Sequence, residues 1–78
     1  MDIKKMEKIA NKIKEVYKCI NKLSVEELEE FIGYVNGVED IYSITNPTKY
    51  NELYNKFKEA RRRAEMLLDI KKGKRRQV

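Results

Sequence analysis

The sequence has no histidine, no tryptophan and a single cysteine, Cys19. A lone thiol cannot form an internal disulfide, and without histidine beside it there is no ligand set for zinc or another soft metal. A reducing compartment is therefore favoured. Because there is no histidine to titrate near neutral pH, the net charge of +5 is not adjustable there. These absences predict a protein without a bound metal or cofactor. The positive net charge predicts that any partner held by charge is anionic.

Glycine and proline are scarce, with three and one residues, which is not the composition of a disordered linker. Long apolar runs are missing as well, because the first 20 residues carry a charge every few positions, unlike a signal peptide or a membrane span. We therefore expect a soluble, cytoplasmic protein that does not bind membranes. With 78 residues the chain makes one domain at most, and its small core leaves little stability to spare.

Residues 3–23 show a clear helical periodicity. Their apolar side chains recur every three or four positions along one line, which predicts an amphipathic helix. The apolar face would consist of Ile3, Met6, Ile9, Ala10, Ile13, Val16, Tyr17, Ile20 and Leu23.

A second helix should begin at Val25, because Ser24 followed three residues later by Glu27 matches a capping box. We expect this helix to end at Asn36, with Gly37 as a left-handed stop. Its inward side chains would be Leu28, Phe31, Ile32 and Val35. Residues 38–45 suit either a helical turn or a short extended piece, and we expect a packed connector with one helical turn.

Asn46 and Pro47 have the pattern of an N-cap followed by proline at the first helical position. They predict a third helix from Pro47 to about Lys72, ended by Gly73. Its inward face would consist of Tyr50, Leu53, Tyr54, Phe57, Ala60, Ala64, Leu67 and Leu68.

Together these segments predict an all-α fold, a small three-helix bundle of two long antiparallel helices plus one short helix. The first and third helices would be the long pair, and the second would close one side. Residues 1–72 would form the domain, and residues 73–78 a flexible basic tail.

Charge is distributed in three blocks along the chain. Residues 1–24 carry seven lysines and three acids, residues 25–45 six acids and no base, and residues 46–78 eleven bases and four acids. The acids of the middle block begin in the first turns of the second helix, where the helix dipole favours negative charge. They either stabilise that helix end or form an acidic patch that docks on a basic surface.

The polar face of the first helix is built from lysines four residues apart, which repel one another unless an anionic surface neutralises them. These residues are Lys4, Lys8, Lys12, Lys14, Lys18 and Lys22. A second basic group near the C-terminus could act as a nucleic-acid arm. It consists of Lys71, Lys72, Lys74, Arg75 and Arg76. In both places the alternative is that the cations only face solvent.

Arg61 is projected into the apolar stripe of the third helix, so its stem either lies along the core or its guanidinium meets an anion at an interface. Arg62 and Arg63 have Glu59 within helical reach and are expected to be solvated. Met66 and Ile70 project to the back of the same helix, which suggests a helix contact outside the monomer core. Arg61, Met66 and Ile70 are therefore the candidate interface for a homodimer or another protein partner.

Nothing in the sequence carries catalysis, since there is no glycine-rich phosphate loop and no pair of acids in an evident cleft. We expect a non-enzymatic protein with no small-molecule substrate. A helix-turn-helix over residues 26–45 is a weak match, because its recognition helix would be short and acidic.

The leading hypothesis is a small basic nucleic-acid-binding accessory or regulatory protein that contacts the phosphate backbone without reading sequence. The alternative is a protein-interaction module, such as an adaptor, inhibitor or assembly subunit, that acts by helix packing.

Overall fold

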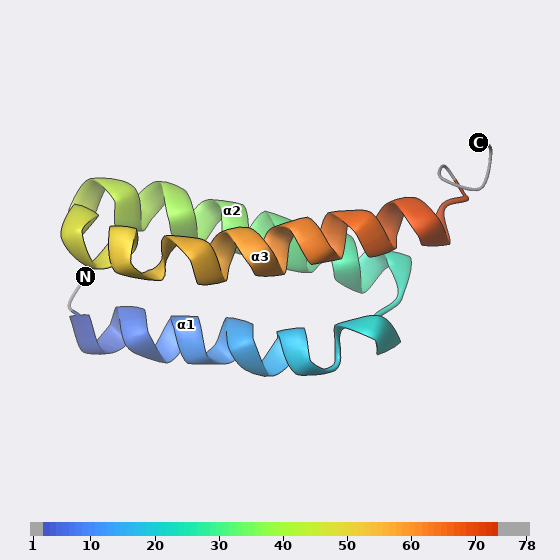
Figure 1. The fold of residues 1–78 in the computed structure, drawn as a ribbon, viewed down its shortest axis with the longest axis horizontal. Helices are drawn as coiled ribbons and strands as arrows, with labels where there is room; N and C mark the ends of the chain where they lie inside the picture. The colour runs from blue at the N-terminus through green and yellow to red at the C-terminus, as the bar shows by residue number, and fades with distance from the viewer. Residues whose placement is uncertain (1–2, 74–78) are drawn as a thin grey trace.

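The structure, a computed structural model, describes residues 3–73. These residues form three α-helices and one 3₁₀ turn, with no strand in that range. The elements are α1 (Ile3–Lys18), η1 (Ile20–Lys22), α2 (Val25–Thr45) and α3 (Pro47–Lys71). They pack side by side into a bundle of 43 × 20 × 17 Å (Figure 1). The all-α three-helix bundle expected from the sequence is confirmed.

The direction of the helices differs from the expected pairing. α1 and α3 run in the same direction, and α2, which lies between them in the sequence, runs in the opposite direction (Figure 1). The long antiparallel pair therefore consists of α2 and α3, with 21 and 25 residues, and α1 is the shortest helix with 16. Taking the first and third helices as the antiparallel pair was wrong, because two very short connections reverse the chain twice.

α1 ends earlier than the apolar periodicity indicated. It stops at Lys18 instead of Leu23, and Cys19 has φ −117° and ψ 23°, outside the helix. The chain then tightens into η1, where the N–H of Leu23 donates to the carbonyl of Ile20 at 3.2 Å. This tighter turn still buries Ile20 while it redirects the chain toward α2.

The start of α2 has the predicted capping box. The N–H of Glu27 donates to Ser24 Oγ at 3.2 Å, and the N–H of Ser24 donates to Glu27 Oε1 at 2.9 Å. These bonds, that of the Ser24 backbone first, lower the pKa of the Glu27 carboxyl. A local sequence motif is thus sufficient to fix this helix end.

Gly37 does not end α2, so the predicted stop at Asn36 and the connector over residues 38–45 are both wrong. Between residues 3 and 73, only Gly73 has a positive φ. The helix continues because the inward stripe continues: Val38, Glu39 and Tyr42 are buried beyond the glycine. Burial along a whole helix outweighs the roughly 1 kcal/mol that one internal glycine costs.

Asn46 is the single residue between α2 and α3. Its N–H donates to the carbonyl of Tyr42 at 2.9 Å, and its own carbonyl accepts from the N–H of Tyr50 at 2.8 Å. It occupies the predicted N-cap position before Pro47, although its side chain makes no capping hydrogen bond. Gly73, with φ 81°, follows the C-cap Lys72 as predicted. The predicted tail beyond it, residues 74–78, lies outside the described residues.

The core lies along the seam of the three helices. Its buried apolar residues are Met6, Ile13, Ile20, Leu28, Phe31, Val35, Val38, Tyr42, Leu53, Phe57, Ala60 and Ala64. α2 and α3 supply nine of these twelve, and α1 with η1 supplies only three, spaced seven residues apart. The other apolar side chains predicted for the inner face of α1 are half-buried, except Ile3, which is exposed.

Candidate functional site

Arg61 is paired inside the molecule. Its guanidinium donates to the carboxylate of Glu39 on α2, and the hydroxyl of Tyr50 donates to the other oxygen of that carboxylate at 2.8 Å. The side chain of Glu39 is only 8% exposed and that of Arg61 24%. The anion that meets Arg61 therefore belongs to the same chain. Burial and the bond to Glu39 raise the pKa of Tyr50 to about 12.

The two described lysines of the predicted C-terminal arm also have internal partners. Lys71 Nζ donates to the carbonyl of Leu23 at 2.6 Å, and it lies 3.5 Å from the carbonyl of Asn21. Lys72 Nζ pairs with Glu29 at 3.1 Å. The contacts of Lys71 fasten the end of α3 to the turn before α2, and that of Lys72 fastens it to α2 itself. Lys74, Arg75 and Arg76 of the predicted arm lie outside the described residues.

The predicted lysine row of α1 and η1 is exposed over its whole length. Lys18 pairs with Glu15 within the same helix at 3.3 Å, a contact that contributes little at the surface. Lys12 lies over the ring of Tyr34 of α2, with its amino group 5.5 Å from the ring centre. Lys4, Lys8, Lys14 and Lys22 make no ion pair with any described residue.

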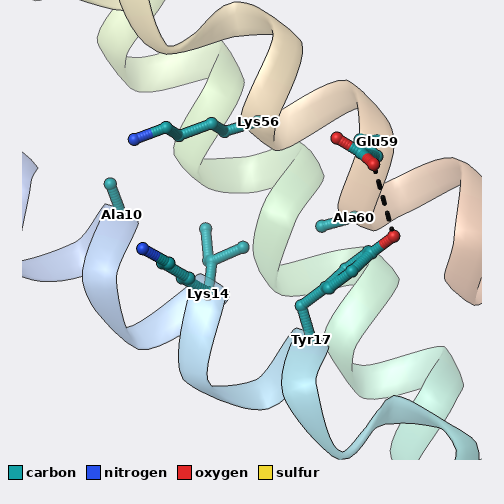
Figure 2. Close-up of a pocket in the computed structure, with 7 residues that line it drawn as sticks. Ala10, Lys14, Tyr17, Lys56, Glu59 and Ala60 are labelled. Atoms are coloured by element: carbon teal, nitrogen blue, oxygen red, sulfur yellow. Dashed lines mark hydrogen bonds between the residues drawn. The ribbon is translucent and has the colours of Figure 1, made fainter.

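Two sides of α1 differ in charge. Toward α2 there is an open hollow in which Lys12 shares the lining with Glu27 and Glu30. Toward α3 there is a cleft of about 210 Å³, which we call the α1–α3 cleft (Figure 2). It is lined by Ala10, Ile13, Lys14, Tyr17, Lys56, Glu59 and Ala60. The hollow toward α2 thus has one lysine and two acids in its lining, whereas the cleft toward α3 has two lysines and one acid.

A second hollow continues the α1–α3 cleft along α3, and the two share Tyr17 and Glu59. We call it the Arg62 hollow; its lining consists of Tyr17, Asn55, Lys58, Glu59, Arg62, Arg63 and Met66. Glu59 accepts a hydrogen bond from the hydroxyl of Tyr17 at 3.4 Å. The only acid in either lining therefore already has a partner.

The cations of these two adjoining sites form what we call the basic face: Lys14, Lys56, Lys58, Arg62 and Arg63. Sequence reasoning selected Lys14 but missed the four residues of α3. Glu59 at helical spacing from Arg62 and Arg63 suggested that these two arginines are ordinary solvated cations, and Lys56 and Lys58 carried no motif that singled them out. The excess of bases after residue 46 was the signal, but its meaning depends on α1 lying parallel beside α3.

Met66 and Ile70, the other predicted interface residues, are exposed at 40% and 47%. Met66 lines the Arg62 hollow together with Arg62 and Arg63 of the basic face. An exposed flexible apolar side chain beside cations suits contact with an amphipathic partner.

Comparisons with known proteins give no relative: no family model, no curated protein and no solved structure matches the chain. Within residues 3–73, no group of three or more potential metal-ligating side chains comes together. None of the described helices is long and apolar enough to cross a membrane. The charges and cavities of the bundle are therefore the features that bear on its function.

Proposed function

We propose that this protein binds nucleic acid without catalysing a reaction, and that the basic face contacts the phosphate backbone. The supporting observation is the charge of two adjoining hollows, whose linings carry five cations and one acid. The acid, Glu59, is engaged by Tyr17. Cations that outnumber acids along one groove attract a phosphate chain, and binding releases its counterions.

The proposal also draws on the exposed lysines of α1. Lys4, Lys8 and Lys22 lie outside the two hollows and are solvent-exposed. In our proposal they add long-range attraction, while the basic face makes the close contacts. Phosphate contacts of this kind position a protein on nucleic acid but carry no sequence information, so sequence preference should be weak.

A fluorescence-anisotropy titration of random duplex DNA, and of RNA, tests this function. If about four cations meet phosphates, affinity should fall roughly 100-fold between about 50 and 200 mM salt. The variant Lys58→Gln/Arg62→Gln/Arg63→Gln should weaken binding at low salt by about tenfold or more. No binding at the lower salt concentration would refute the proposal.

A matched variant separates the basic face from the outer lysine row. Lys4→Gln/Lys8→Gln/Lys22→Gln also removes three positive charges, so it lowers the net charge of the protein by the same amount. We expect it to weaken binding only about two- to threefold, because its charges act at a distance. A larger loss in this variant than in the basic-face variant would move the binding surface to the outer row of α1.

A second candidate function is protein interaction by helix packing, favoured by the exposure of Met66 and Ile70. The partner would be a second copy of the chain or another protein, and in the first case light scattering should give the mass of a dimer. Met66→Lys/Ile70→Lys should then yield a monomer with unchanged helix content. A monomeric parent protein that binds DNA would favour the first function.

A further inference from the structure

The α1–α3 cleft is polarised along its length. Its floor is apolar, formed by Ala10, Ile13 and Ala60. Figure 2 shows the amino groups of Lys14 and Lys56 on either side of Ala10, at one end of the cleft. The hydrogen bond from Tyr17 to Glu59 closes the opposite end (Figure 2). The cleft thus has a positive end, an apolar middle and an end with a carboxylate.

Two small side chains create this space. Ala10 of α1 and Ala60 of α3 face the cleft, where larger residues would fill it. The volume of about 210 Å³ is below that of sites for drug-sized ligands, which start near 300 Å³. It exceeds the roughly 150 Å³ of an apolar cavity that accepts benzene. The cleft therefore has room for one ring or a short aliphatic chain.

The charges specify the orientation of such a ligand. Lys14 and Lys56 each present an ammonium group, and together they can donate to the two oxygens of one carboxylate. An anionic head placed at the other end would meet the carboxylate of Glu59 and be repelled. The ligand's head should lie near Ala10, and its apolar body should lie toward the ring of Tyr17.

We propose that the α1–α3 cleft binds a small organic monocarboxylate with a short apolar body, with its carboxylate between Lys14 and Lys56. The site is a ligand site without chemistry. It does not depend on nucleic-acid binding by the basic face. If both functions hold, the ligand occupies two of the five cations and should compete with phosphate contacts.

Sodium octanoate is the probe, titrated into the full chain while amide shifts are followed by heteronuclear NMR. Ligands this small bind with a Kd on the order of 1 mM. Saturable shifts should concentrate around Ala10, Lys14, Tyr17 and Ala60. The neutral 1-octanol lacks the anionic head and inorganic phosphate lacks the apolar body, and each should bind at least about fivefold more weakly.

Three variants test separately the two lysines, the apolar floor and the net charge of the protein. Lys14→Gln/Lys56→Gln should weaken octanoate about fivefold, because two partly solvated charge contacts are lost. Ala10→Leu keeps both charges but fills the floor, and it should abolish the saturable shifts. Lys4→Gln/Lys22→Gln removes the same net charge from exposed lysines outside the cleft and should leave the affinity for octanoate unchanged. Far-UV circular dichroism of each variant establishes that the helices remain.

Several outcomes would overturn the site. Equal binding of octanol and octanoate would mean that the lysines recognise no head group. Equal binding of phosphate and octanoate would mean that the apolar floor is not used. Absence of saturable shifts, or an Ala10→Leu variant that is folded and binds as before, would place any binding elsewhere. Failure of DNA binding alone would leave this inference intact, since the octanoate titration contains no nucleic acid.

Discussion

Helices α2 and α3 bury side chains along their whole shared length, whereas α1 with η1 buries only Met6, Ile13 and Ile20, one residue in seven. The α2–α3 pair also encloses the charged cluster of Glu39, Arg61 and Tyr50. α1 lies against α3 beside an unfilled cleft. The difference teaches that the α2–α3 pair holds most of the buried core, whereas the α1–α3 contact leaves open the cleft and hollow that carry the basic face.

The largest expected effect compares the two seams directly. Phe57→Ala should lower the free energy of unfolding by about 4 kcal/mol, because it empties a fully buried position of α3. Ile13→Ala should cost only about 2 kcal/mol, since the site borders two solvent-open hollows that relax around the smaller side chain. Urea denaturation followed by circular dichroism measures both. Equal losses would mean that α1 is as integral to the core as α3.

The next effect concerns the charged cluster of the α2–α3 seam. Arg61→Leu should cost about 3 kcal/mol, because it leaves the buried carboxylate of Glu39 without its cation. Glu39→Leu/Arg61→Leu should recover most of this loss, since no isolated charge remains. Arg62→Leu is the matched control, exposed and next in sequence, with an expected change within about 0.5 kcal/mol. Similar losses at Arg61 and Arg62 would show that the cluster contributes no more than a surface pair.

The smallest effect tests the helical path through α2. Gly37 is exposed, and apart from its chain neighbours and the nearby backbone of its own helix no atom lies within 4 Å of an added Cβ. Gly37→Ala should therefore raise the free energy of unfolding by about 0.5 to 1 kcal/mol. Gly73→Ala should lower it by about 1 kcal/mol, because φ is 81° there. Measured urea midpoints that move in the same direction for both glycines would contradict the assignment of these two conformations.

Much of the fold could be predicted from local chemistry. The capping box at Ser24 and the glycine end at Gly73 are short-range signals, and both are confirmed. Gly37 carried the same kind of signal as Gly73, but only the burial of Val38, Glu39 and Tyr42 distinguishes an internal glycine from a terminal one. The end of α1 was missed for a related reason, because the apolar periodicity runs on through η1.

The candidate site was predicted less completely. The α1 lysines were found because their spacing is visible along the chain, and they are exposed as expected. Lys56, Lys58, Arg62 and Arg63 were missed, because they become one surface only when α3 is placed beside α1. Lys71 and Lys72 were assigned to an arm, and their contacts with Leu23 and Glu29 connect residues more than 40 positions apart.

The sequence by itself determined that three helices form, together with the capping box at Ser24, the glycine end at Gly73 and most of the apolar stripes, because these depend on residues within one or two turns of each other. It also determined the excess of positive charge. Only the tertiary structure decided which cation is internal and which is free to act. Arg61 and Arg62 are neighbours in the chain, but 100° of helical rotation directs one to Glu39 and the other to solvent. That rotation has meaning only when the position of α2 is known.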